Sequence, residues 1–482
     1  MSGRIRQRVV IVGAGFAGFH AARTLAKLSK RTKGAAELVV LNATDYFLYV
    51  PLLPQVAGGV LDPRRVAVPL AGNLPGARLV LGSVDEIDLE ARRLGMVDPE
   101  GDRDSLSYDR LLLTVGSVNR LLPIPGVAEH AHGFRSIGEA LYLRDHLVRQ
   151  IELADSSDDP AEREARCTFV VVGAGYTGTE VAAYGQLLTR DAARRRSGLR
   201  DQPLRWLLVD LAPRVLPELD PRLSRSADQV LRRRGVEIRT GTTVQEATRD
   251  GVRLSDGEFV RTRSLVWCVG VRPDPLVEAL GLPTQRGRLV VDEYLNVPGH
   301  PELFACGDAA AVPDLTRPGE ITPMTAQHAE RHGRRAARNL AASLGLGRRR
   351  AYRHHDLGFV VDLGGVQAAA NPLGVPLGGP PAAAVTRGYH LLTIPANRLR
   401  IATDWLLDAT LPRQTVQLGL VRGSAVPLAA GAPGGPGRDQ PVSPGGDQPG
   451  RPGGDQPART EAPAPDPSAA PDQTPAPGRT RK

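Results

Sequence analysis

The chain has 482 residues, of which 41% are hydrophobic and 23% are charged, and its formal net charge is +9. This length allows two or three domains, each with its own core. The positive charges are mostly scattered arginines, which argues against nucleic acid as a partner. No run of about 18 apolar residues occurs, so no bilayer-spanning helix is predicted and any membrane contact is expected to be peripheral.

The three cysteines, Cys167, Cys268 and Cys306, are far apart and form no CxxC pattern. This spacing argues against a disulfide framework, a structural zinc site or a reactive dithiol. We therefore expect three buried thiols, and we predict no metal site.

The first predicted unit begins with RVVIVGAG at 8–15, a continuous apolar run typical of a parallel strand covered on both faces. A glycine-rich turn leads into helical spacing at 19–30 and then into a second strand, AELVVLN, at 36–42. Residues 108–118, YDRLLLTVGSV, predict another buried strand that ends near a glycine.

The same order recurs later in the chain, with RCTFVVVGAG at 166–175, a helix at 179–190 and LRWLLVD at 204–210. The polar segment 190–203 is interpreted as a surface loop, and SLVWCVGVRP at 264–273 closes this second unit. The sequence therefore predicts an internal duplication of strand–helix–strand units.

After residue 300 come LFACGDAA at 303–310, a long helical stretch at 325–345 and glycine-punctuated, strand-like segments from about 350. An apolar and basic stretch follows at 389–414. From 427 onward the chain is rich in Pro and Gly and repeats DQP every eight residues. Such a composition cannot bury enough apolar area to offset its ordering entropy, so disorder is expected there.

Two G-x-G-x-x-G turns carry the chemical prediction. In such a turn the first glycine permits a tight bend, the second lets the backbone approach a pyrophosphate, and the third lets the helix pack closely on the strand. The phosphates bind free N–H groups at the positive end of the helix dipole. The two sets are Gly13, Gly15 and Gly18, and Gly173, Gly175 and Gly178.

The residue that ends the next strand helps to discriminate between dinucleotides. Asp210 is placed to accept hydrogen bonds from a ribose and to repel a 2′-phosphate, which favours NADH over NADPH, unless it is only a turn residue. Asn42 holds the equivalent place in the first unit. Gly307 and Asp308 suit a sugar-alcohol chain such as that of FAD, although alone they would indicate an ordinary turn. NADH with a flavin suggests electron transfer between the two.

The predicted fold class is α/β, with two Rossmann-like dinucleotide-binding domains for FAD and NADH, a smaller C-terminal region and a disordered tail. The expected boundaries are 1–120 and 301–345 for the FAD-binding domain, 121–300 for the NADH-binding domain, 346–426 for the C-terminal region and 427–482 for the tail.

The chain resembles type II NADH dehydrogenase, the non-proton-pumping NADH:quinone oxidoreductase, within the flavoproteins that have two dinucleotide-binding domains. Both glycine turns, LLLTVGS, VWCVGVRP and FACGDAA carry the wider resemblance, while PLLPQVAGG and GEALYLRDHL point to this family more narrowly.

The resemblance implies a role for each matching residue. Glu180 would face the nicotinamide side of the flavin, although a first-turn acid stabilised by the helix dipole is an equal alternative. NADH would be held by Gly173, Gly175, Gly178 and Asp210. FAD would be held by Gly13, Ala14, Gly15, Gly18, Asn42, Gly116, Gly307 and Asp308.

The resemblance also implies a quinone site near a helix with the pattern A-Q-x-A-x-Q. AQHAER supplies Gln327, but Arg331 replaces the second glutamine, and Asn42 replaces the family's usual acid. Arg331 has several open roles: it can donate to a quinone carbonyl, stabilise an anionic flavin, close the pocket or be exposed.

The last apolar and basic stretch would lie in the membrane interface as an amphipathic helix. Asp404 and Asp408 interrupt it, so packing on the protein's own sheet is the competing interpretation.

The expected function is therefore transfer of hydride from NADH to FAD and of electrons to a quinone, either menaquinone or ubiquinone. The protein is expected at the cytoplasmic face of the cell membrane, or in the cytoplasm, as a homodimer. The alternatives are a reductase of a soluble electron acceptor and a flavin-based redox-sensing binding protein. A sulfide:quinone or dithiol reductase needs a reactive cysteine pair, which the sequence does not offer.

Overall fold

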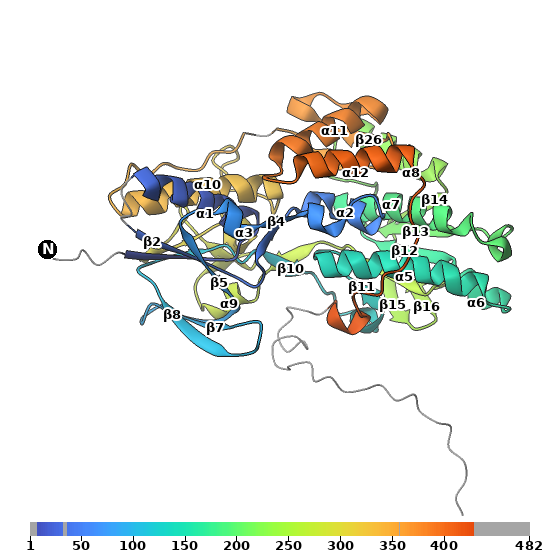
Figure 1. Ribbon diagram of the computed structural model, residues 1–482, viewed down its shortest axis with the longest axis horizontal. Coiled ribbons are helices and arrows are strands. Elements are labelled where there is room, and N and C mark those ends of the chain that lie inside the picture. Colours follow the sequence, from blue (N-terminus) through green and yellow to red (C-terminus); the bar gives the residue numbers. More distant parts are fainter. Residues whose placement is uncertain (1–6, 32–35, 356, 429–482) are drawn as a thin grey trace, which may run out of the picture. The chain divides into compact units, whose positions relative to one another are not determined.

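The computed structural model describes residues 7–31, 36–355 and 357–428 (Figure 1). Two parallel sheets form its centre, and each contains one of the glycine turns predicted from the sequence. Of the predicted tail, only Pro427 and Leu428 are among the described residues, and Leu428 is buried.

The first sheet contains the first glycine turn and is assembled from both ends of the sequence. Its strand order is β22 (Asn296–Val297), β23 (His300–Ala305), β9 (Arg110–Leu113), β1 (Gln7–Val12), β2 (Ala36–Asn42) and β5 (Ala77–Leu81), and all but β22 run parallel. The late strand β23 pairs with β9, so the segment that follows β23 reaches the carboxyl edge of this sheet.

Helices α1 (Phe16–Arg31) and α10 (Ala326–Ser343) pack against one another over this sheet (Figure 1). Gly333 makes their close approach possible, because a Cβ at that position would lie 2.0 Å from the Ala17 carbonyl oxygen.

The second sheet is fully parallel and contains the second glycine turn. Its order is β11 (Ala131–His132), β18 (Ser264–Trp267), β12 (Thr168–Val172), β13 (Arg205–Asp210) and β14 (Val236–Thr240). The helices of this unit are α4 (Val127–His130), α5 (Ile137–Asp155), α6 (Pro160–Arg166), α7 (Tyr176–Ala193) and α8 (Pro221–Arg233). Residues 190–193, expected to begin a surface loop, instead continue α7, because Ala192 is fully buried and anchors its last turn.

Short strand pairings, most of them antiparallel, surround the two sheets. One of them, β10 (Ser117–Asn119) with β19 (Val271–Pro273), joins the segment after β9 to the segment after β18. The carboxyl edges of the two parallel sheets are therefore linked directly. The remaining small strands are β3 (Tyr46–Leu48) with β4 (Ala67–Pro69), β6 (Ser83–Asp88) with β7 (Arg93–Val97) and β8 (Arg103–Ser107), β15 (Val244–Thr248) with β16 (Gly251–Leu254) and β17 (Phe259–Arg261), and β20 (Thr284–Gln285) with β21 (Arg288–Val290) and β24 (Ala310–Ala311).

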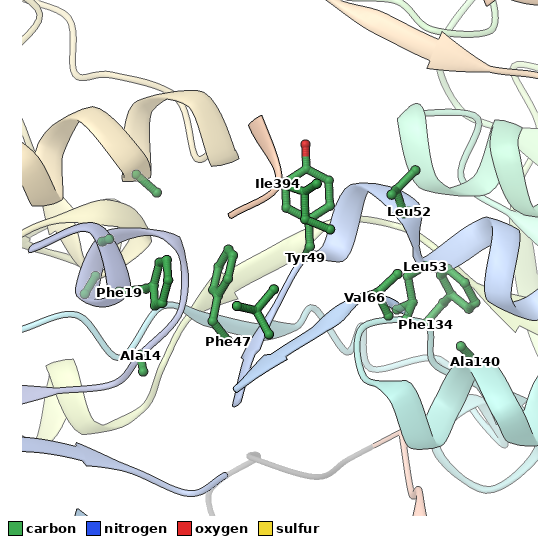
Figure 2. Packing of buried hydrophobic residues seen from close by; sticks show 14 of the residues in the cluster. Ala14, Phe19, Phe47, Tyr49, Leu52, Leu53, Val66, Phe134, Ala140 and Ile394 are labelled. Atoms are coloured by element: carbon green, nitrogen blue, oxygen red, sulfur yellow. The ribbon is translucent and has the colours of Figure 1, made fainter. Parts of the chain in front are cut away.

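Three short helices lie between these strands: α2 (Leu53–Ala57), α3 (Leu70–Asn73) and α9 (Leu276–Ala279). The buried core around α1, β3 and α2 includes Phe19 stacked on Phe47, with ring centroids 4.6 Å apart, and Tyr49 with Ile394 (Figure 2). The core therefore joins the first unit to the C-terminal region.

The C-terminal region contains the antiparallel strands β25 (Val360–Asp362), β26 (Ala368–Ala370) and β27 (Leu377–Gly378), followed by α11 (Gly379–Thr393) and α12 (Arg398–Thr410). Helix α12 buries Ile401 and Trp405, whereas Leu399 is 85% exposed and Leu406 is 63% exposed. Every helix in the described ranges is too short or too polar to cross a membrane.

The two acids of α12 are both paired with arginines of this protein. Asp404 accepts from Arg65 at 2.9 Å, and Asp408 accepts from Arg413 at 2.5 Å. Their carboxylates therefore do not interrupt the exposed leucine face of the helix.

Candidate functional site

The first glycine turn follows β1 and admits no other residue at two of its positions. Gly13 has φ +90°, and a Cβ there would lie 2.6 Å from the Thr114 carbonyl oxygen. A Cβ on Gly18 would lie 1.8 Å from the Gly13 carbonyl oxygen. A Cβ on Gly15, by contrast, would meet no protein atom within 4 Å. The turn is therefore closed on the protein side and open where a phosphate would approach the start of α1.

The second turn repeats this geometry at the start of α7. Gly173 has φ +103°, and its Cβ would lie 2.2 Å from the Cys268 carbonyl oxygen. The Cβ of Gly178 would lie 1.8 Å from the Gly173 carbonyl oxygen, while Gly175 again faces open space. The N-cap residue of α7 is Gly175, which has no side chain to cap the helix, so this helix start is suited to an anion.

The strand-end residues contact the two turns in matching ways. Asn42 Oδ1 accepts the Ala14 N–H at 2.8 Å, and Asp210 accepts the Ala174 N–H in the same manner. The other polar atom of each side chain has a different role. Asn42 Nδ2 donates to the Thr44 carbonyl at 2.8 Å, while Asp210 Oδ1 accepts the Ala212 N–H at 2.7 Å. The strand ends thus fix both turns, and each bonded oxygen keeps a second lone pair for a ribose hydroxyl.

Gly307 and Asp308, predicted to belong to the first unit although they follow the second unit in the sequence, lie beside the first glycine turn. A Cβ on Gly307 would lie 3.0 Å from the Ala17 Cβ, in the first turn of α1. Asp308 Oδ2 accepts from Ser117 Oγ at 2.7 Å, and Ser117 follows Gly116, which has φ +76° and open space beside it. Gly116, Gly307 and Asp308 therefore line the same place as Gly13 and Gly15.

Arg135 and Arg288 also belong to this place, although the sequence did not single them out. Arg135 donates to both the carbonyl and the hydroxyl of Ser117, and Arg288 donates to the Gly307 carbonyl at 3.4 Å. Burial lowers the pKa of both guanidinium groups, to about 10 for Arg288, and the Asp308 charge opposes that shift. Arg135 thus stabilises the segment that contains Ser117, and Arg288 stabilises the turn at Gly307, on either side of the Asp308 carboxylate.

Glu180, in the first turns of α7, lies in a buried polar cluster. One carboxylate oxygen accepts the backbone N–H of Asp362 at 2.8 Å, and burial raises the pKa of Glu180 well above its usual value. The Asp362 carboxylate accepts from Gly364 N–H at 2.8 Å, from Gln55 Nε2 at 3.0 Å and from the Tyr184 hydroxyl. Sequence reasoning missed Asp362; the available signal was an acid that ends an apolar strand within VVDLGG.

Gln327 and Arg331 both bind the segment between α10 and β25. Gln327 donates to the Gly358 carbonyl at 3.3 Å and accepts the Leu357 N–H at 3.3 Å. Arg331 Nη1 lies 3.2 Å from His354 Nδ1 and donates to the His355 carbonyl. The Arg331 side chain is therefore half-buried and in contact with this loop.

The three cysteines are free; Cys167 and Cys306 are buried as predicted, whereas Cys268 is only partly buried. Burial raises the pKa of Cys167 to about 11 and that of Cys268 to about 12, and it raises the pKa of Cys306 as well. The nucleophilic thiolate forms are therefore disfavoured, which argues against disulfide or sulfide chemistry.

Comparisons with known proteins agree with this architecture. Residues 7–333 match the family described as pyridine nucleotide-disulphide oxidoreductase. The chain is 33% identical over 354 residues to the type II NADH:quinone oxidoreductase Ndh of Mycobacterium tuberculosis, covering 70% of this chain and 73% of that protein. It is 28% identical over 410 residues to demethylphylloquinone reductase NdbB of Synechocystis, covering 83% of this chain and 96% of the relative.

Among solved structures, NDH2 from Plasmodium falciparum in complex with NADH has a similar fold. Its TM-score is 0.77 at 16% sequence identity, and the match covers 85% of this chain and all of that one. At this identity the likeness concerns the fold.

Proposed function

The chain belongs to the pyridine nucleotide-disulphide oxidoreductase family and, within it, to the type II NADH:quinone oxidoreductases, and from this premise we propose that it passes hydride from NADH to FAD and electrons on to a quinone. The observation that carries the proposal is the pair of glycine turns with matching geometry, on sheets whose carboxyl edges are linked by β10 and β19. Two dinucleotides held at these edges would present their reactive rings to one another.

The residues fit both cofactors. At the first turn, the open face of Gly15 and the N-terminus of α1 suit the pyrophosphate of FAD, and Asp308 suits its sugar-alcohol chain. At the second turn, Gly175 and the uncapped start of α7 suit the pyrophosphate of NADH, and Asp210 suits its ribose. When bound, FAD supplies a group that takes up hydride and releases electrons.

The protein's own residues do the positioning. Arg135 and Ser117 hold Asp308 in place, and Asn42 and Asp210 fix the turns that meet the phosphates. Glu180 is the proposed catalytic acid of the site, and Gln327 and Arg331 are proposed to shape the quinone entrance through the loop at 354–358. Hydride transfer depends on this positioning more than on acid–base groups.

We further propose that α12 attaches the protein to the cytoplasmic face of the membrane, where a quinone resides. Leu399 and Leu406 lie on its exposed face, and the exposed Arg400 would meet anionic headgroups, while Arg398 donates to the carbonyls of Leu392 and Ile394. Because Asp404 and Asp408 pair with arginines of the protein, they leave this face uninterrupted. The quinone is menaquinone or ubiquinone.

Domain organisation and assembly complete the proposal. Residues 1–120 and 301–345 would bind FAD, residues 121–300 would bind NADH, and residues 346–426 would attach the protein to the membrane. The protein is proposed to be a homodimer, which light scattering on the purified protein tests directly.

An acceptor screen tests the proposed reaction. NADH oxidation is followed with menaquinone analogues, ubiquinone analogues, oxygen and a small iron–sulfur protein as acceptors. Oxidation by a quinone analogue well above the oxygen rate supports the proposal. Preference for the iron–sulfur protein would support a reductase of a soluble acceptor. Slow turnover with a long-lived reduced complex would support a redox-sensing protein.

Vesicle binding tests the attachment separately. The double variant Leu399→Lys and Leu406→Lys should lose sedimentation with anionic lipid vesicles while keeping NADH oxidation by a water-soluble quinone analogue. Leu153→Lys, which changes an exposed leucine on α5, is the matched control and should still sediment. Unchanged binding by the double variant would refute the role of α12.

A further inference from the structure

Glu180 and Asp362 form a buried pair of carboxyl groups that the proposed reaction uses only in part. The structure gives Glu180 one donor among the described residues, the Asp362 backbone N–H. The Asp362 carboxyl has three: the Gly364 N–H, the Gln55 amide and the Tyr184 hydroxyl. Hydrogen bonds donated to a carboxylate favour its charged form, so the two groups are not equivalent.

The orientation of Gln55 fixes the role of Asp362 further. Trp405 Nε1, on α12, donates to Gln55 Oε1 at 2.6 Å. An indole N–H can only donate, so the Gln55 oxygen must face Trp405 and its NH2 group must face Asp362. Gln55 is itself 2% exposed and cannot turn without breaking a buried hydrogen bond. The Asp362 oxygen that faces it must therefore act as an acceptor.

The surrounding charges point the same way. Arg234 donates to the carbonyls of Leu363 and Gly364, and Arg387 donates to the Gly365 carbonyl at 2.6 Å. Burial raises the pKa of Asp362 above its usual value, while the hydrogen bonds from Gly364 and Tyr184 and the charges of these two arginines limit that rise. For Glu180, burial and the Asp362 charge both raise the pKa. Of the two buried acids, Glu180 is the one that is easier to keep neutral.

We propose that Asp362 is a positioning residue which carries the negative charge of this buried pair and so keeps the Glu180 carboxyl protonated as a proton donor for quinone reduction. The inference rests on the proposed function. Gln55, Tyr184 and the turn at 363–365 hold the charge in place, and Trp405 fixes Gln55.

The proton balance gives this donor a task. Reduction of a quinone to a quinol takes up two electrons and two protons, whereas hydride from NADH supplies two electrons and one proton. In the proposed step, the O–H bond of Glu180 breaks and a quinone oxygen gains that proton. The resulting carboxylate then takes a proton from water, so one proton is consumed overall for each NADH oxidised.

Infrared spectroscopy of the flavin-loaded protein tests the assignment without turnover. A protonated carboxyl has a carbonyl stretching band that a carboxylate lacks, and we expect a buried one in the wild-type protein at neutral pH. Glu180→Gln should remove it. Asp362→Asn should keep the band at low pH but move its titration midpoint to lower pH, because the neighbouring charge that favours the neutral form is gone.

The control is Asp145→Asn, which changes another buried acid that accepts two backbone N–H groups, those of Leu418 and Gly419. It should leave both the Glu180 band and its midpoint unchanged. The inference is overturned if Asp362→Asn removes the band while Glu180→Gln retains it, or if the midpoint does not move.

Tyr184→Phe serves if Asp362→Asn does not fold, because it keeps the ring and removes only one donor to Asp362. The proton should then divide between the two acids, so adding Glu180→Gln to Tyr184→Phe should leave part of the band. Complete loss of the band in that double variant would mean that the remaining donors keep Asp362 charged, which also supports the inference. A band that the double variant keeps at full wild-type intensity would overturn the inference, because Glu180 would then not carry the proton.

Stopped-flow measurements separate this inference from the proposed function. In Asp362→Asn, NADH should still reduce the flavin at the wild-type rate, while reoxidation by a quinone analogue should become slower at neutral pH and regain speed as the pH falls. If reoxidation keeps the wild-type rate and pH profile, the inference is wrong. If the wild-type protein fails to reduce quinones at all, the proposed function is wrong, while the infrared titration still tests the charge on the pair.

Discussion

The two glycine turns have the same backbone geometry but different strand-end residues. In each turn the first and third glycines leave no room for a Cβ, and the middle one faces open space. The first turn is fixed by an amide, Asn42, and the second by a carboxylate, Asp210.

The residues that follow each strand explain the difference. The loop after Asn42 presents the Thr44 carbonyl, which needs a hydrogen-bond donor. The loop after Asp210 presents the Ala212 N–H, which needs an acceptor. The amide of Asn42 is therefore matched by its own loop. The glycines therefore define the backbone geometry of each turn. The loop after the second strand determines whether the residue that ends this strand can be a charged carboxylate.

The largest effect should come from the third glycine of either turn. Gly18→Ala and Gly178→Ala would each place a Cβ 1.8 Å from a backbone carbonyl oxygen, so both should lower the free energy of unfolding by about 3 kcal/mol. Denaturant unfolding measures this, and Gly72→Ala, at an exposed position with free space, is the control. If only one of the two variants were as stable as the wild-type protein, the two glycine turns would not be equivalent.

The middle glycines should separate the two cofactors. Gly15→Ala and Gly175→Ala meet no protein atom within 4 Å, so stability should change by about 0.5 kcal/mol or less. Gly15→Ala should release FAD on gel filtration, whereas Gly175→Ala should keep FAD and raise the KM for NADH about tenfold, a change of about 1.4 kcal/mol. Loss of both cofactors from either variant would contradict two separate cradles.

The strand-end carboxylate of the second turn should set the choice of nicotinamide dinucleotide. Asp210→Ser removes the carboxylate proposed to accept from the ribose. The second change, Leu211→Arg, adds a guanidinium at a side chain that is 66% exposed, so the arginine displaces no packed residue. The ratio of kcat/KM for NADH to that for NADPH should fall about tenfold or more. An unchanged ratio would mean that Asp210 does not contact the ribose.

The smallest effect should come from making the first turn resemble the second. Asn42→Asp would point a carboxylate oxygen at the Thr44 carbonyl and leave that carbonyl without its donor. We expect a loss of about 1 kcal/mol in unfolding free energy, with FAD retained. A variant as stable as the wild-type protein would show that the Thr44 carbonyl does not select the amide.

Local patterns predicted the two glycine turns because a buried strand, the turn and a helix follow one another directly in the sequence. The sequence also predicted that Asp308 belongs beside the first turn, from the glycine–aspartate pair at the end of a late strand, although that pair alone would indicate an ordinary turn. It did not predict that Asp362 reaches Glu180, because the two are 182 positions apart and meet only through the packing of β25 on α7. Likewise, the partners of Asp404 and Asp408 depend on tertiary contacts that no local pattern contains.

The hydrogen bond between Trp405 and Gln55 has a practical consequence for anyone who shortens this chain. Deleting α12 to obtain a better-behaved protein would remove more than the proposed membrane contact, because Gln55 would lose the partner that orients its amide. A weak quinone reductase obtained in that way would not by itself show that lipid is required for catalysis. Trp405→Phe in the undeleted chain keeps the helix and isolates the contribution of that single hydrogen bond.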